Sequence, residues 1–140
     1  GEGMTGATPN EFVTEAELKY VCEILSGFSK VEVISEKLMD TVVAVSGSSP
    51  AYVFMFIEAM ADGGVKQGLP RATSYRLAAQ TCLGTAKMIL EKGIHPGELK
   101  DMVCSPAGTT IEAVQVLEER GFRSAIIEAM RVCAEKSRNM

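Results

Sequence analysis

The sequence predicts a mainly helical fold, in which a helical domain over residues 37–140 follows a single β-α-β unit over residues 1–36. Residues 1–36 contain one amphipathic helical repeat between two short apolar stretches, whereas helix start and stop signals recur throughout residues 37–140. The length of 140 residues is that of about one domain. Because two parallel strands joined by one helix cannot form an independent sheet, we do not expect residues 1–36 to form a domain of their own.

The β-α-β unit is assigned from three segments. Residues 4–7 and the alternating residues 30–34 have strand character. Thr14 and Glu17 have the spacing of a capping box, in which each side chain accepts a hydrogen bond from the backbone of the other. Residues 15–26 form the expected helix, with apolar side chains at helical spacing at Leu18, Val21, Cys22 and Leu25.

The second part is expected to contain about six helices. Ser49 is a natural N-cap and Pro50 a natural first helical residue. Glycine and proline mark most of the other helix ends. The helices are expected at residues 36–45, 51–61, 70–90, 96–103, 110–119 and 123–136.

The helix at 51–61 is apolar on every face and carries one charge, Glu58. The window 42–61 resembles a membrane span, but the interruption at 46–50 leaves a run shorter than the ~18 residues that a span requires. A helix that is apolar all round is buried in a large core or between subunits. In a chain of this size we expect the second, and therefore a homodimer, with no membrane. Glu58 is expected to find its partner at that interface.

Composition excludes several kinds of partner and site. With 14 Lys+Arg against 18 Asp+Glu, the net charge is −4, which disfavours binding to nucleic acid. No CxxC pair is present, and the single histidine, His95, is not at ligand spacing from a cysteine, so we expect no metal. We expect reduced cysteines in a cytoplasmic protein and a capping or surface position for His95. The cysteines are Cys22, Cys82, Cys104 and Cys133.

Residues 1–6, GEGMTG, match the glycine pattern GxGxxG of dinucleotide-binding proteins. In those proteins a strand precedes the glycine turn, and a helix begins directly after it. Here no strand precedes the pattern, and Pro9 and Asn10 separate it from the helix. We therefore reject these residues as a phosphate site.

A hydroxyl-rich turn before the helix at 110–119 is the candidate binding site. Thr109 and Glu112 have capping-box spacing, which predicts Thr109 as the N-cap. The free amides of the first turn, together with the hydroxyls of Ser105 and Thr110, can converge on a small anion. Gly108 lets the backbone approach a ligand. An ordinary capped turn explains the same residues equally well.

The chain resembles the pyrroline-5-carboxylate reductases. The most specific segment is 96–117, and three further segments support it: 45–52 (VSGSSPAY), 61–64 (ADGG) and 68–70 (GLP). Within 96–117 the resemblance rests on Leu99, Val103, Ser105, Gly108, Thr110, Ala113 and Val114. The family usually has glycine in place of Ser49 and Ala107. The added Cβ at Ala107 is expected to be harmless if φ is negative there, although it is also expected to tighten the loop.

The resemblance implies a two-domain oxidoreductase that reduces 1-pyrroline-5-carboxylate to L-proline, the last step of proline biosynthesis. Residues 1–36 would be the end of the dinucleotide-binding domain, and residues 37–140 the helical dimerisation and substrate-binding domain. NADP or NAD would be bound mainly outside this chain, by the glycine-rich loop of that first domain. Substrate would contact Ser105, Gly108, Thr109 and Thr110. The partners implied are a small carboxylate substrate and a second subunit, as a homodimer or a higher oligomer.

Two alternatives remain. The chain could be a helical dimerisation module without a substrate role, or the helical domain of another Rossmann-type dehydrogenase. If the reductase assignment is right, the 140-residue chain by itself is expected to be inactive, because it has no pyrophosphate-binding loop.

Overall fold

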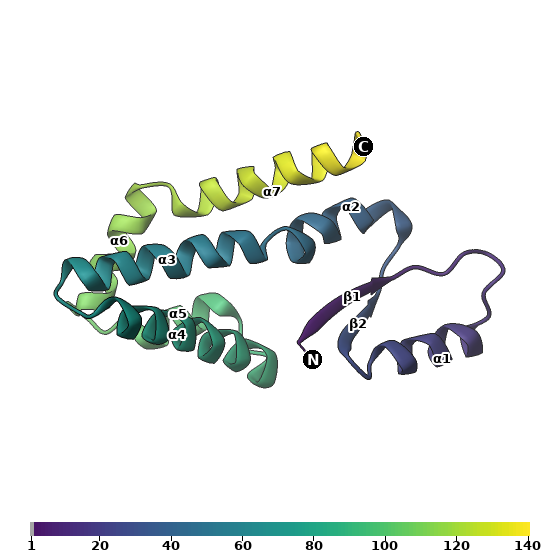
Figure 1. The fold of residues 1–140 in the computed structure, drawn as a ribbon, viewed down its shortest axis with the longest axis horizontal. Coiled ribbons are helices and arrows are strands. Elements are labelled where there is room, and N and C mark those ends of the chain that lie inside the picture. Colours follow the sequence, from purple (N-terminus) through teal and green to yellow (C-terminus); the bar gives the residue numbers. More distant parts are fainter. Residues whose placement is uncertain (1) are drawn as a thin grey trace. The chain divides into compact units, whose positions relative to one another are not determined.

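The computed structural model describes residues 2–140, so Gly1 of the hexapeptide GEGMTG lies outside the described residues. The chain forms two compact units, residues 2–49 with Glu128–Met140 and residues Pro50–Ile127. Most of the described residues lie in helices, and the two strands both belong to the first unit (Figure 1). The prediction of a mainly helical fold that follows one β-α-β unit is confirmed.

The first unit begins with the expected parallel pair of strands. Strand β1 (Gly3–Ala7) pairs with β2 (Ser29–Val33), and helix α1 (Glu15–Leu25) connects them. The capping box is present: the Thr14 amide donates to Glu17 Oε2 at 2.9 Å, and the Glu17 amide donates to Thr14 Oγ1 at 3.3 Å. The capping box therefore satisfies two amides at the start of α1.

The segment expected as one helix over 36–45 has three successive helical geometries. A 3-10 turn, Glu36–Leu38, is followed by one α-helical turn, α2 (Met39–Val42), and by a π-helical turn, Val43–Gly47. The Ser48 amide donates to the Val43 carbonyl at 2.8 Å, five residues back. Three valines in four positions crowd this backbone, because β-branched side chains restrict the preceding helical turn. The prediction of a regular helix was therefore wrong here.

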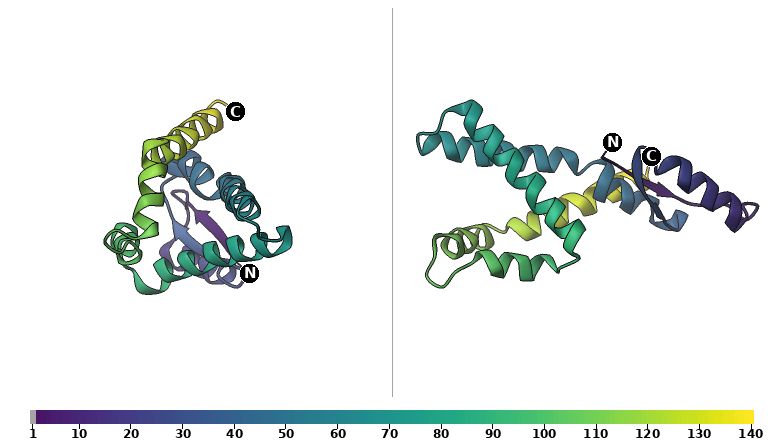
Figure 2. Two further views of the ribbon diagram at one scale, coloured as in Figure 1. Left: turned by 90° about the vertical axis from the view of Figure 1, so that its left-hand side faces the viewer. Right: turned by 90° about the horizontal axis from the view of Figure 1, so that it is seen from below.

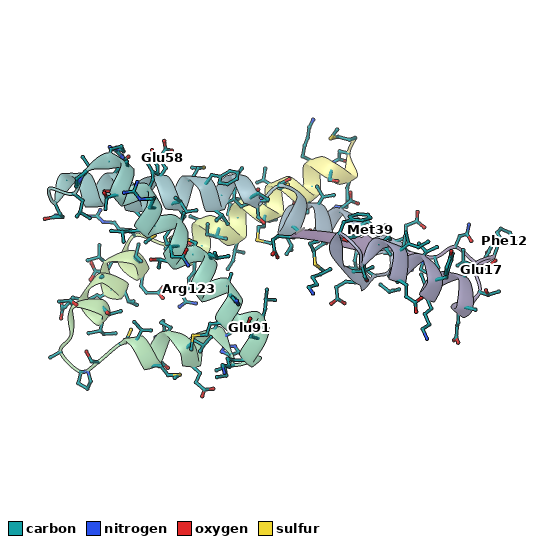
Figure 3. All side chains as sticks on the ribbon, turned by 60° about the horizontal axis from the view of Figure 1, so that its bottom comes forward. Phe12, Glu17, Met39, Glu58, Glu91 and Arg123 are labelled. Atoms are coloured by element: carbon teal, nitrogen blue, oxygen red, sulfur yellow. The ribbon has the colours of Figure 1, made fainter. Side chains whose placement is uncertain are left out.

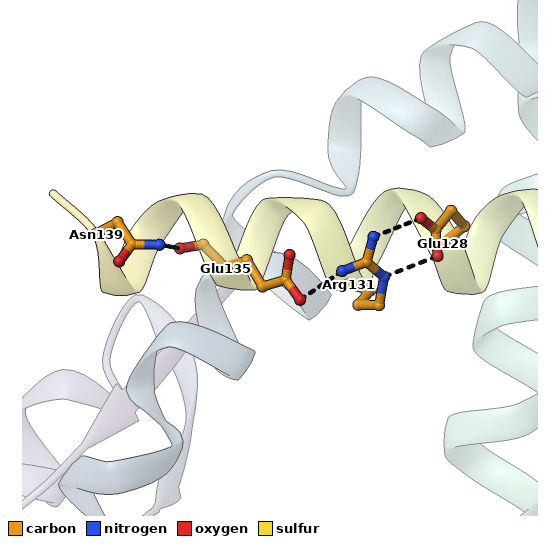
Figure 4. Close-up of polar contacts among 4 residues, drawn as sticks. All are labelled: Glu128, Arg131, Glu135 and Asn139. Carbon is orange, nitrogen blue, oxygen red and sulfur yellow. Dashed lines mark hydrogen bonds and ion pairs between the residues drawn. The ribbon is translucent and has the colours of Figure 1, made fainter.

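The last residues of the chain pack in the first unit, within helix α7 (Phe122–Arg138). Ser137 Oγ donates to Asp40 Oδ1 at 2.6 Å, and Cys133 Sγ lies 3.2 Å from Ser48 Oγ. On the exposed face, Arg131 pairs with a glutamate on either side, as Figure 4 shows for Glu128 and Glu135. These exposed pairs are worth only a few tenths of a kcal/mol each.

The second unit consists of four helices and the first residues of α7. The helices are α3 (Pro50–Lys66), α4 (Arg71–Lys92), α5 (Pro96–Val103) and α6 (Thr109–Glu119), as seen in Figure 2. Pro50 begins α3 as predicted, and α3 packs against α4.

A glycine turn and an aromatic contact fix the packing of α3. Gly68 has a φ of 99°, and the Leu69 amide donates to the Gly64 carbonyl at 3.0 Å, which closes α3 with a Schellman motif. The Phe56 ring lies 6.0 Å from that of Phe122, between centroids. These contacts join α3 to the elements that follow it in the same unit.

Among residues 2–140 no large apolar side chain is fully buried within the single chain. Among residues 2–140 the buried apolar residues are four alanines, whereas Phe54 and Met55 of α3 are 69% and 67% exposed. Figure 3 shows the side chains on the ribbon, and the labelled Glu58 of α3 points away from it and is exposed. The helical stretch Glu36–Lys66 is long and apolar enough to cross a membrane by length and composition. A single polypeptide of this fold therefore leaves its most apolar helix uncovered. The buried alanines are Ala44, Ala61, Ala78 and Ala134.

Candidate functional site

The candidate site lies in the loop between α5 and α6. The Gly108 amide donates to the Ser105 carbonyl at 3.0 Å, which closes a four-residue turn. Pro106 occupies the second position, where its fixed φ suits a turn. Ala107 occupies the third with a φ of 56°, in the left-handed region. This is the geometry that a type II turn requires, and it normally selects glycine at the third position.

Gly108 is required for steric reasons. Its φ is −82°, which any residue adopts. A Cβ at this position, however, would overlap with Ser105 Oγ and lie 3.0 Å from the Ser105 carbonyl oxygen. The Ser105 hydroxyl thus occupies the space beside Gly108, directly before the first turn of α6.

The first turn of α6 has no side-chain cap. Gly108 is the N-cap and Thr109 is the first helical residue, so the prediction of Thr109 as the N-cap was wrong. The turn at 105–108 starts the helix one residue earlier than the Thr-x-x-Glu spacing suggests. Thr109 therefore cannot form the expected capping box with Glu112. The first amides of α6 receive no hydrogen bond from an N-cap side chain.

The structure brings the four predicted substrate residues together. Ser105 and Thr109 are exposed, and Gly108 and Thr110 are half-buried. Within Pro50–Ile127 the side-chain hydroxyls of Ser105, Thr109 and Thr110 form no hydrogen bond with another protein group. Three hydroxyls and the uncapped helix amides thus lie at one turn, and such groups can bind a carboxylate.

The two ionisable residues singled out from the sequence lie elsewhere. His95 is the N-cap of α5, where Nδ1 accepts a hydrogen bond from the Gly97 amide at 3.0 Å. The prediction of a capping position is confirmed. Glu58 is exposed on α3 and forms no ion pair within Pro50–Ile127. Neither residue contributes a group to the loop at 105–110.

An ion pair between α3 and α4 was not predicted from the sequence. The Arg71 guanidinium pairs with Asp62 and lies 5.5 Å from the centroid of the Tyr75 ring. The hydrogen bond to Asp62 raises the pKa of Arg71. The two residues are nine apart, so no helical i,i+4 pattern signals the pair. It joins two helices of the unit and carries no chemistry of its own.

The described residues build neither a metal centre nor a dinucleotide phosphate site. Residues 2–140 contain no group of three or more His, Cys, Asp or Glu side chains that could hold a metal. The four cysteines are free and half-buried. Gly3 and Gly6 lie within β1 instead of in a turn before a helix. A Cβ at Gly6 would lie 3.3 Å from Val42 Cγ1, so this glycine allows close packing of the segment that contains α2.

Comparison with known proteins identifies the family. Residues 36–140 match the family described as pyrroline-5-carboxylate reductase dimerisation. The chain is 62% identical to the pyrroline-5-carboxylate reductase of Escherichia coli (strain K12), over 99% of its own length and 51% of that protein. It is 51% identical to the enzyme of that name from Synechocystis, over 100% of this chain and 52% of that protein. The chain thus spans about half the length of these curated relatives.

Solved structures agree in fold. The pyrroline-5-carboxylate reductase of Coxiella burnetii superposes with a TM-score of 0.95 at 33% identity, over 99% of this chain and 52% of that one. The pyrroline carboxylate reductase of Plasmodium falciparum, solved with NADP bound, superposes with a TM-score of 0.88 at 37% identity, over 97% of this chain and 55% of that one. The chain therefore belongs to the pyrroline-5-carboxylate reductase family, and residues 36–140 match its dimerisation domain.

Proposed function

We propose that this chain is the C-terminal part of an enzyme that reduces 1-pyrroline-5-carboxylate to L-proline, and that it supplies the substrate-carboxylate loop and the dimer core. The observation that carries the proposal is the uncapped first turn of α6, which contains Thr110 and begins at Gly108, beside the Ser105 hydroxyl. Family membership supports it, because the relatives over this region are reductases of that name.

The substrate carboxylate fits the loop chemically. Helix amides and the positive end of the helix dipole stabilise an anion, and hydroxyls add hydrogen bonds that fix its orientation. The reaction adds a hydride to the imine carbon and a proton to the imine nitrogen. Binding the carboxylate on a rigid turn holds the imine carbon in one position, and such positioning accounts for much of the acceleration of a two-reactant step.

The nicotinamide cofactor, NADP or NAD, supplies the hydride in this proposal. The Plasmodium relative was solved with NADP. The residues described here do not fit its pyrophosphate, because Gly3 and Gly6 lie within a strand. We therefore assign no residue of this chain to the cofactor. A purified protein of these 140 residues alone is expected to show no NAD(P)H-dependent reduction of the imine, and measurable turnover would contradict this assignment.

The uncovered helix α3 supports a homodimer. Its Phe54 and Met55 are more than two-thirds exposed in the single chain. Exposed apolar patches of this kind mark protein interfaces or membrane contacts. The family description names dimerisation for this region, which favours a second copy as the cover. Light scattering of the native protein should show no monomer at micromolar concentration, and a stable monomer would remove this explanation. We also propose a cytoplasmic location, because the four cysteines are free thiols and the cytosol keeps thiols reduced.

The substrate role is tested by removing the two hydroxyls. In the native protein, S105A/T110A should raise KM for 1-pyrroline-5-carboxylate by about 5- to 150-fold, the equivalent of ~1–3 kcal/mol of lost hydrogen bonding. Dimer mass should not change. The matched control is S26A/T81A, which removes two exposed hydroxyls bonded to helix carbonyls elsewhere. Unchanged kinetics in S105A/T110A would favour the alternative function, a dimerisation module in which the α6 turn has no substrate role.

A further inference from the structure

We infer that a second copy of this chain packs along the distal half of α4, residues 83–92, and that this half of the helix depends on the partner for its stability. The inference rests on the homodimer proposed above and extends its contact from α3 to a second surface. That surface lies on the helix that leads directly to α5 and the candidate loop.

The two halves of α4 differ in burial. In the first half, Ser74 and Ala78 are buried where α3 packs against the helix. From residue 83 to residue 92 every residue is exposed. Leu83 is 59% and Leu90 is 83% exposed. The helix therefore continues for about three turns in which no side chain is buried within the single chain.

The exposed apolar side chains form one stripe along this half of the helix. The stripe begins one residue after the buried Ala78, which corresponds to a rotation of about 100°, so it points away from the side that contacts α3. A polar side of the helix also differs from the stripe, and there Lys87 pairs with Glu91 at 3.5 Å. The stripe residues follow one another at helical spacing of three or four positions and are Ala79, Leu83, Ala86 and Leu90.

A bare helix end of this length needs a cover. Isolated helices shorter than about 12–15 residues are marginal in water, and packing of an apolar side supplies most of the stability of a helix in a protein. Two observations identify the cover as a second copy. Residues 36–140, which include α4, match the dimerisation family. The uncovered Phe54 and Met55 of α3 belong to the same unit as the stripe, so one partner can cover both surfaces.

The test replaces one leucine of the stripe with glutamate in the native protein. L83E should reduce the mass measured by light scattering at micromolar concentration from that of a dimer to that of one chain, because an unpaired carboxylate is costly to bury against an apolar partner. M88E is the matched control. Met88 is a large apolar residue of the same helix, 42% exposed on the side away from the stripe, and M88E should keep the dimer mass. Circular dichroism shows whether each variant retains its helices.

Hydrogen exchange of the unsubstituted protein provides a second measurement that needs no variant. The amides of residues 86–92 should be protected at micromolar concentration, whereas the amides of an uncovered helix end exchange rapidly. Rapid exchange of these amides in the dimer would overturn the inference, even if L83E failed to fold.

A further variant, F54E on α3, separates this inference from the proposed homodimer. If F54E is monomeric and L83E remains a dimer, the dimer forms without α4 and the inference is wrong. Loss of the dimer in both L83E and M88E also overturns it, because the effect would not be specific to the stripe. If the unsubstituted protein is itself a monomer, the proposed homodimer fails. A monomeric L83E beside a dimeric M88E supports the inference.

Discussion

Helices α1 and α6 both start near a Thr-x-x-Glu sequence, and their first turns differ. In α1, Thr14 is the N-cap and exchanges hydrogen bonds with Glu17. In α6, Thr109 already belongs to the helix, and the N-cap is Gly108, which has no side chain to donate or accept. The same spacing thus produces a closed helix start in one place and an open one in the other.

The residue directly before a helix therefore determines whether the amides of the first turn are available to a ligand. The β1–α1 connection delivers Thr14 in extended conformation, with a ψ of 160°, as a capping residue requires. The turn at 105–108 delivers Gly108 to the cap position in the same extended conformation, with a ψ of 166°, but glycine has no side chain to cap the helix. We expect substitutions at the start of α1 to lower the free energy of unfolding. Substitutions at the start of α6 are expected to weaken substrate binding.

The largest effect is expected from G108A. The new Cβ would overlap with Ser105 Oγ, so the hydroxyl must leave its position beside α6, while the φ of −82° remains acceptable to alanine. KM for 1-pyrroline-5-carboxylate should rise at least about tenfold, ~1.4 kcal/mol of binding. Steady-state kinetics on the native protein checks this, with circular dichroism to show that helix content is retained. A KM within twofold of the original would contradict the placement of Ser105.

A smaller effect, on stability alone, is expected from T14A. Loss of a threonine N-cap costs ~1 kcal/mol, because the helix amides lose their acceptor. Chemical denaturation of the native protein should show this loss for the unit that contains α1. KM should not change, since α1 contributes nothing to the loop at 105–110. A substrate-binding defect in T14A would show that the two helix starts are not independent.

The capping box also predicts a pH dependence. Hydrogen bonds from the backbone and the hydroxyl of Thr14 hold the pKa of Glu17 below its ordinary value of 4.5. A lowered pKa in the folded state means that the stabilisation is fully present above pH 4.5 and is lost as the pH falls through the folded-state pKa. The difference in Tm between the native protein and E17Q should therefore shrink as the pH is lowered from 6 to 3. Glu128, whose pKa the Arg131 hydrogen bond lowers, titrates in both proteins and cancels in this difference.

The smallest effect is expected from T109A. Because Thr109 is the first helical residue and not the cap, its replacement should change stability by less than ~0.5 kcal/mol. Denaturation of T109A beside T14A makes the comparison direct. A stability loss equal to that of T14A would mean that Thr109 caps α6 in solution. A rise in KM without such a loss would support its place in the substrate loop.

Local signals predicted much of the fold. The capping box at Thr14, the helix start at Pro50 and the cap at His95 were predictable because each depends on residues within a few positions of one another. The π-helical turn at 43–47 was not predicted, because the local spacing of its residues does not distinguish a π turn from an α turn. The Arg71–Asp62 pair was not predictable, since a contact between two helices depends on tertiary structure. Ala107 lies between these cases: its departure from glycine is visible in the sequence, but its φ is not.

Patterns of side chains along the chain were sufficient to predict the order of the elements, the family and the residues of the candidate loop. The folded chain, in contrast, shows which residue begins α6, where the Ser105 hydroxyl lies and that Ala107 adopts a positive φ. It also showed that the buried apolar side chains of residues 2–140 are alanines, so the large apolar residues of α3 remain uncovered within one chain. The physical reason is that a turn, a steric overlap and a buried surface each depend on atoms brought together in space, which spacing along the chain does not specify.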